Sequence, residues 1–464
     1  MSKIIQVFKD WKLMKRVLIT IALLLVFRLG AQLTLPGVTV NEQASGDSFF
    51  SLMNTLSGGG LNSFSIFALG VSPYITSSII IQLLSSDVVP PLSRWKKEGE
   101  SGKIKTERVT RLTAVAIGII QALAITLAYS SNSYITVNSP FSETGTVIIF
   151  SIIMTAGTMM SIWIADLISK NGIGNGTSLI IFAGIAASLP AQFAQQFSYT
   201  VSGNNSTDLY IGVLNFIGII FMFLMVIVLV AFFQDSERRF PLQQTGKKMD
   251  KSDKNIAPYL PIKVNVSGVI PVIFASSIVT LIPTIAQFLP ESSYAKLVMI
   301  DLFAFTNWYG LVIYAIFIIL FTFFYGHVSI DPETMSENFK KQGTFIQGVK
   351  PGEDTKKLIA RTINNLCIVG GIYLAFIAVL PYILSAIGIT SFIPIGGTSL
   401  IILVGVAIDT YKNVDARIIA SSYKTSINNS KKLTDKKISE TKKQNEKNVS
   451  NESSEKDNIG DLII

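Results

Sequence analysis

The residue types that most often carry enzyme chemistry are scarce in this sequence. Its 464 residues include one histidine, His327, and one cysteine, Cys367. They cannot build a histidine-based metal site or an internal disulfide, and both lie in or beside apolar runs, where packing is their expected role. The nearest approach to a phosphate-binding loop, residues 99–104, lacks the required spacing and the Ser or Thr that would hold magnesium. We therefore expect no catalytic residue, no metal site and no cofactor, so that any nucleotide-derived energy must come from a partner.

The overall composition indicates a membrane protein. Hydrophobic residues make up 49% of the chain and charged residues only 15%, against about 25% charged in an average soluble protein. The mean hydropathy is +0.49. These values exclude a soluble enzyme, a coiled coil or a disordered scaffold as a description of the whole chain.

Apolar runs long enough to cross a bilayer recur along the chain. A helical span needs about 20 mostly apolar residues. The stretch 362–408 is uncharged and too long for one span, and Pro381 and residues 388–397 divide it into two. The first run is too long for a cleaved signal peptide and is expected to be retained. The predicted spans are 17–36, 71–87, 109–130, 146–167, 177–197, 210–233, 268–288, 308–327, 362–384 and 396–411.

The distribution of basic residues orients these spans. Every Lys and Arg except Arg28 and Lys296 falls in a segment that this arrangement places in the cytoplasm. Because cytoplasmic loops carry the excess of Lys and Arg, the pattern predicts ten spans in the cytoplasmic membrane, with both termini cytoplasmic. The net charge of +9 is thus mostly a topology signal and does not indicate nucleic-acid binding.

The chain divides into two apolar halves and a polar tail. We expect an N-terminal half over 1–207, a C-terminal half over 208–411 and a disordered cytoplasmic tail over 412–464. Two cytoplasmic loops, 235–266 and 328–361, are long for simple connections. They either dock a partner or only satisfy the charge rule that orients the spans.

The region before the second span has an unusual pattern. Residues 48–86 carry no charge, and Ser57–Gly60 precedes a short apolar piece, Leu61–Leu69, which we term the candidate plug. Such a piece could be a half-helix that enters the membrane, which is tolerated where protein or a water-filled cavity surrounds it. The alternative is a loop on the outer surface.

A short repeat links the two halves. Gly70–Ile75 opens the second span and Gly268–Ile273 opens the seventh, with the same glycine, proline and isoleucine positions. These spans cross the membrane in opposite directions, so the match is consistent with an inverted repeat of five spans in each half.

Nine short motifs are spread over both halves of the chain. They are Phe27–Gly30, Phe67–Ile75, Ile79–Leu84, Lys97–Gly102, Gly172–Gly176, Ile180–Gly184, Leu260–Asn265, Gly268–Ser277 and Gly396–Leu400. These motifs resemble those of the SecY family, the channel subunits of the bacterial protein-export translocase, and they occur in family order over roughly residues 10–420.

The resemblance implies an all-α fold of two five-helix halves around an hourglass pore. An aliphatic ring would narrow its waist, and a short helix would plug it from outside. A sixth ring position falls on Thr177, which makes this ring more polar than in relatives with an aliphatic residue there. The implied ring, which we term the candidate ring, is Val71, Ile75, Ile181, Ile273 and Ile402, and the plug residues are Leu61, Asn62, Ser63, Phe64, Ser65, Ile66 and Phe67.

The resemblance also implies a lateral gate between spans two and three and spans seven and eight. Thr76 and Gln121 occupy positions that resemble the family's polar gate contacts. Polar residues in a membrane also hydrogen-bond to neighbouring helices, so a structural role is an equal alternative for both.

The implied partners are small SecE-like and SecG-like membrane subunits, a SecA-like motor ATPase, the ribosome and signal-bearing polypeptides. The motor and the ribosome would dock on the two long loops. Lys350 replaces a typical arginine and keeps the charge without the planar fork, and Gln347 replaces a common proline. The docking candidates are Arg238, Arg239, Lys340, Lys341 and Lys350.

The sequence leaves three functions to be compared. They are a passive protein-conducting channel, a secondary transporter for a small solute, and a scaffold or insertase without a pore. A transporter should carry ionisable residues near the membrane midplane. The spans offer almost none beyond Arg28, for which we expect an anchoring role. The channel is therefore favoured.

Overall fold

The computed structural model is predominantly helical. It forms two compact units, Ile19–Thr410 and a smaller unit of Met1–Leu18 with Tyr411–Ile464. The elements discussed below concern the larger unit. The structure describes residues 11–40, 54, 57–61, 63–85, 89–131, 135–137, 143–202, 209–244, 259–290, 293–305, 307–386 and 397–421.

Each predicted span overlaps a helix. Among the described residues, six helices are long and apolar enough to cross a membrane, and the shorter apolar helix Ile270–Ala286 joins them. The all-α membrane fold is thus confirmed, while ten crossings remain a prediction. The helices are α2 (Trp11–Gln32), α4 (Ser72–Ser85), α5 (Pro90–Lys97), α6 (Glu100–Ser131), α7 (Glu143–Asn171), α8 (Gly176–Ser202), α9 (Leu209–Asp235), α10 (Ile270–Ala286), α11 (Tyr294–Leu302), α12 (Trp308–Ser329), α13 (Pro332–Lys341), α14 (Glu353–Ala386) and a final helix over 397–421.

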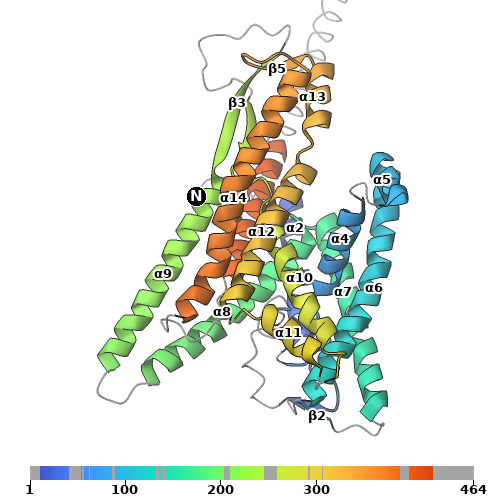
Figure 1. Cartoon of the computed structure of the whole chain (residues 1–464), viewed down its shortest axis with the longest axis vertical. Helices are drawn as coiled ribbons and strands as arrows, with labels where there is room; N and C mark the ends of the chain where they lie inside the picture. The colour runs from blue at the N-terminus through green and yellow to red at the C-terminus, as the bar shows by residue number, and fades with distance from the viewer. Residues whose placement is uncertain are drawn as a thin grey trace, which may run out of the picture. The chain divides into compact units, whose positions relative to one another are not determined.

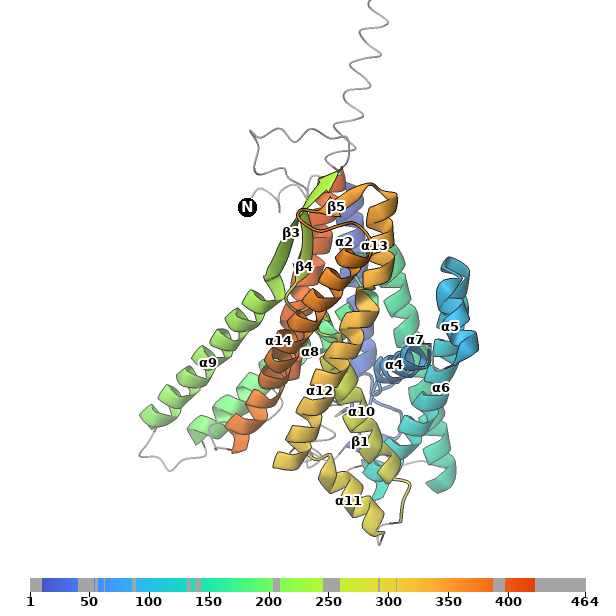
Figure 2. The same cartoon turned by 45° about the horizontal axis from the view of Figure 1, so that its top comes forward.

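Two small antiparallel sheets join segments that lie far apart in the sequence. In the first sheet, β1 (Val38–Val40) pairs with β2 (Ile135–Val137). In the second, the strand order is β4-β3-β5, with β3 at Glu237–Gln244, β4 at Tyr259–Lys263 and β5 at Thr344–Ile346. This second sheet lies at one end of α12 and α14, and α11 lies toward their opposite end (Figures 1 and 2). The two long loops, which the sequence predicted without strands, are therefore joined through β3 and β5.

The repeated motif produces the same local structure in both halves. Gly70 and Gly268 adopt positive φ angles of 54° and 64°, in a region that favours glycine. Pro73 and Pro271 then lie in the first turns of α4 and α10, where the missing N–H of proline has no cost. The two helices therefore begin in the same way, as an inverted repeat requires.

Several hydroxyl groups inside the helices are satisfied within their own helix. Thr155 Oγ1 donates to the Ser151 carbonyl at 2.7 Å, and Thr280 Oγ1 donates to the Ser276 carbonyl at 2.9 Å. Both threonines are buried. Because each hydroxyl bonds within its own helix, these residues fit an apolar environment without needing partners on neighbouring helices.

Candidate pore and plug

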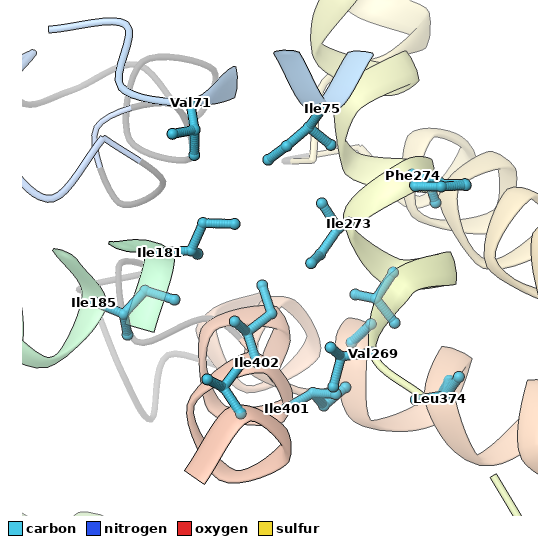
Figure 3. Packing of buried hydrophobic residues seen from close by; sticks show 14 of the residues in the cluster. Val71, Ile75, Ile181, Ile185, Val269, Ile273, Phe274, Leu374, Ile401 and Ile402 are labelled. Carbon is cyan, nitrogen blue, oxygen red and sulfur yellow. The ribbon is translucent and has the colours of Figure 1, made fainter. Parts of the chain in front are cut away.

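The candidate ring forms one contiguous group of side chains. All of its residues belong to a single buried apolar cluster, with exposed fractions between 1% for Val71 and 7% for Ile273. They come from the turn before α4, from α4, α8 and α10, and from the final helix. Their side chains gather around one shared space (Figure 3). Residues distant in the sequence thus meet in one apolar cluster.

The same cluster contains apolar residues that the sequence did not single out. Ile185, Val269 and Ile401 are also buried there, and Figure 3 places them beside the candidate ring. Ile185 follows Ile181 by one turn of α8. This helical spacing is the sequence feature that could have predicted its place beside the candidate ring. Thr177 is only half-buried; it lines the cavity described next rather than joining this cluster.

A cavity of about 870 Å³ adjoins this cluster, and Ile75, Ile181 and Ile273 form part of its lining. Its walls differ in character. The N-terminal half contributes charge of both signs, from Lys103, Glu107, Asp166 and Lys170. The C-terminal half contributes uncharged residues only: Ile270, Ile273, Phe274, Tyr325, Val328 and Ser329.

An ion pair beside this cavity lies at the ends of two predicted spans. Arg111 donates to Asp166 at 2.8 Å and joins α6 to α7. It also pairs with Glu107 one turn earlier in α6. Both Arg111 and Asp166 lie at the ends of predicted spans, and an ion pair lowers the cost of keeping charge there.

The described residues of the candidate plug do not form a half-helix. Residues 57–61 and 63–71 form turns with one isolated bridge between Ser65 and Thr34, and we term residues 57–61 and 63–70 the turn segment. Gly58 and Gly59 have φ angles of 73° and 87°, and Phe64 has a φ of 44°. Because a helix requires negative φ at successive residues, these positions interrupt it. Asn62 lies outside the described residues.

The turn segment is nevertheless buried. Leu61 and Phe64 have no exposed surface and pack with residues of α6 and α7, including Ala122 and Met154. The Leu35 N–H donates to the Phe64 carbonyl at 3.1 Å, and the Ile66 N–H donates to the Leu33 carbonyl at 3.0 Å. A loop lying on the outer surface would expose these residues, so the described part of the segment is interior.

The gate candidates have different surroundings. Thr76 is buried, and its hydroxyl donates to the Ser72 carbonyl of its own helix at 3.2 Å. Gln121 is 2% exposed, and its Oε1 accepts no hydrogen bond within the described part of the chain. Helix α10 contacts both α4 and α6, so three of the four helices expected at the gate meet.

The docking candidates lie in and beside the β4-β3-β5 sheet. Arg238 and Arg239 belong to β3, and their guanidinium groups lie over the rings of Phe240 and Tyr259, at 5.1 and 4.8 Å. Lys340 and Lys341 end α13. Lys350 follows β5, and its carbonyl accepts from Thr355 Oγ1 at 2.9 Å. The sheet brings the two loops together, because β3 of the first loop pairs with β5 of the second (Figure 2).

Comparison with known proteins decides the family. A sequence model of the SecY family matches residues 65–411. The protein translocase subunit SecY of Mycoplasma capricolum subsp. capricolum is 43% identical over 431 residues, which cover 89% of each chain. The chain belongs to the SecY family. SecY of Staphylococcus aureus is 38% identical over 430 residues, covering 91% of this chain and 98% of the relative.

Solved structures support the same fold. A protein-conducting channel aligns with a TM-score of 0.61 at 18% identity, covering 86% of this chain and 91% of the other. Sec61 in a canine ribosome–channel complex from the endoplasmic reticulum aligns with a TM-score of 0.57 at 17% identity, with the same coverage. At these identities the likeness concerns the fold alone. Together with family membership, it identifies the chain as a multi-pass membrane protein with a SecY-type architecture.

Proposed function

We propose that this chain is the central protein-conducting channel of a Sec translocase. It passes unfolded secretory polypeptides across the cytoplasmic membrane and releases signal sequences and membrane segments sideways into the bilayer. The observation that carries this proposal is the aliphatic cluster around Ile75, Ile181 and Ile273, located next to a large cavity in a SecY-family chain.

The chemistry of the constriction suits a polypeptide conductor. A channel for unfolded chains has to pass every type of side chain, so its waist should hold none of them tightly. Branched aliphatic side chains offer no hydrogen bond, and a narrow apolar constriction resists water and ions by dewetting. The candidate ring acts as the waist, and the candidate plug closes it from the outside.

The energy for transport comes from partners. The chain is not an enzyme, and a SecA-like motor or a ribosome drives the polypeptide through it. Their docking surface is the β4-β3-β5 sheet with α13, where Arg238, Arg239 and Lys350 supply positive charge. SecE-like and SecG-like subunits hold the halves 1–207 and 208–411 together, and both termini of the chain face the cytoplasm.

Depletion of the chain in its own cell tests this function. Secreted precursors are pulse-labelled, and protease accessibility reports whether they cross the membrane. Uncleaved precursors should accumulate inside within about one generation, and a plasmid copy of the wild-type chain should restore export. Continued export together with loss of one solute's uptake would instead establish a secondary transporter.

A further inference from the structure

Arg28 is a charged residue inside the first predicted span, and its side chain reaches the turn segment. It lies in α2, is partly buried, and its Nη1 donates a hydrogen bond to the carbonyl of Gly58. Among the described residues, no carboxylate forms an ion pair with it. A guanidinium in this environment is costly unless a partner satisfies it, so the choice of a neutral backbone carbonyl requires an explanation.

Gly58, whose carbonyl accepts this bond, lies directly against the backbone of α8. A Cβ built on Gly58 would lie 2.7 Å from the Cα of Gly184 in α8, and the φ of Gly58 is 73°. Gly58 is therefore held between α8 on one side and the Arg28 guanidinium on the other. Gly58 itself has no side chain with which to pack.

The later part of the turn segment is held differently. Ser63 Oγ donates to the Ala31 carbonyl at 3.2 Å, and the rings of Phe27 and Phe67 stack at 5.6 Å. A Cβ on Gly30 would lie 2.2 Å from the Phe67 ring, so α2 fits closely against that ring. These contacts are apolar or neutral, and among the described residues Arg28 is the one charged group that α2 directs to the segment.

We propose that Arg28 is a positioning residue that holds the turn segment in the closed channel through the Gly58 carbonyl. The inference rests on the proposed channel function and names the residue that biases its gating. When the turn segment leaves, Arg28 loses this acceptor, so the hydrogen bond stabilises the closed state relative to the open state. A neutral carbonyl suits this role because separating a buried ion pair is strongly destabilising. A hydrogen bond to a carbonyl binds the cation and can still be broken when the channel opens.

The test uses the full chain with its partner subunits, reconstituted into vesicles containing a chloride-sensitive dye. Arg28→Met removes the donor and keeps an apolar chain of similar length, whereas Arg28→Lys keeps the charge without the planar fork. Leu29→Ala is the matched control, since Leu29 neighbours Arg28 in α2 but is 67% exposed. The amount of each variant in the membrane is measured first.

Arg28→Met should raise resting chloride entry several-fold and admit a precursor whose signal sequence is defective. Arg28→Lys should lie between this variant and the wild type, and Leu29→Ala should match the wild type. A tight Arg28→Met channel with unchanged signal discrimination would overturn the inference alone. Failure of the wild-type vesicles to translocate a normal precursor would overturn the proposed function as well, and the two failures are therefore distinguishable.

A cross-linking readout separates positioning from general loss of structure. In a Cys367→Ala background, cysteines replace Ala31 and Ser63, which are in contact in the closed structure. Arg28→Met should slow formation of this cross-link several-fold, because the segment spends less time against α2. The same rate with Met and Arg at position 28 would contradict the proposal. If Arg28→Met does not accumulate, the Arg28→Lys comparison supplies the same two readouts.

Discussion

At the residue scale, family position predicted residues that the structure gathers in one apolar cluster, but not the contacts of the turn segment. Val71, Ile75 and Ile273 could be proposed because they lie in recognisable motifs. The partner of Arg28 could not, because a backbone carbonyl 30 residues away has no signature in the sequence. Close glycine contacts are equally invisible, since they depend on which backbones meet in three dimensions.

Gly157 in α7 shows this kind of contact and can be tested. A Cβ there would lie 2.0 Å from the Ile66 carbonyl oxygen of the turn segment, which is backbone and cannot rotate away. Alanine normally favours a helix over glycine by about 1 kcal/mol, yet we expect Gly157→Ala to destabilise the protein by roughly 1–3 kcal/mol through overpacking. Thermal unfolding of the purified protein in detergent measures the difference.

The control for this substitution is Gly218→Ala in α9, where an added Cβ meets no atom within 4 Å. It should be neutral or slightly stabilising because only helix propensity changes. Equal unfolding temperatures for the two variants would show that the turn segment does not pack against α7 as described.

At the element scale, the spans were predictable and the connections were not. Long apolar runs identify membrane helices almost by length alone, whereas β3, β4 and β5 are short and contain polar residues. Their pairing joins Leu242 to Ile346, more than 100 residues later, and no local pattern indicates such a partner. Helix α13 was likewise missed, although Asp331-Pro332 is a typical helix start.

The start of α13 leads to a pH-dependent prediction. The Glu333 N–H donates to Asp331 Oδ1 at 3.0 Å. A hydrogen bond from the Thr334 hydroxyl, together with the Glu333 and Thr334 backbone N–H groups and nearby Lys356, lowers the pKa of Asp331 below its ordinary value of 3.8. A lowered pKa means that the carboxylate stabilises the folded helix above pH 3.8, and that this stabilisation is lost as the pH falls through the lower folded value.

Hydrogen exchange at the first amides of α13 measures this effect. Asp331→Ala should cost about 1 kcal/mol, which is roughly fivefold faster exchange at neutral pH if α13 opens locally. Asp331→Asn keeps an oxygen acceptor that does not titrate, so it should remain close to wild type at neutral pH. Below about pH 4 the wild-type carboxylate becomes protonated and loses its stabilising effect, whereas the amide does not. The first amides of α13 should therefore exchange more slowly in Asp331→Asn than in the wild type at that pH. An unchanged ratio would show that the carboxylate is not the cap.

At the scale of the whole molecule, the repeated motif gives each half one helix that borders the proposed polypeptide path. The structure gives α4 and α10 matching starts at Gly70 and Gly268, and it places Ile75 and Ile273 in the same cluster (Figure 3). If a polypeptide passes between these helices, they have to separate at that point. The family resemblance predicted that Ile75 and Ile273 lie in one ring, but the sequence did not predict the charged wall of the cavity beside them.

A cross-link across the constriction tests this pathway. In a Cys367→Ala background, Ile75→Cys and Ile273→Cys are joined by oxidation or a short thiol reagent, and export of a labelled precursor is followed in vesicles. We expect export to stop on cross-linking and to return on reduction of the disulfide. The control is Gly326→Cys with native Cys367: a Cβ at position 326 would lie 2.3 Å from the Cys367 sulfur, so this bond would join α12 to α14 within the C-terminal half. Export should survive the control cross-link because no separation is needed there, and unimpaired export with Ile75 and Ile273 joined would place the polypeptide path elsewhere.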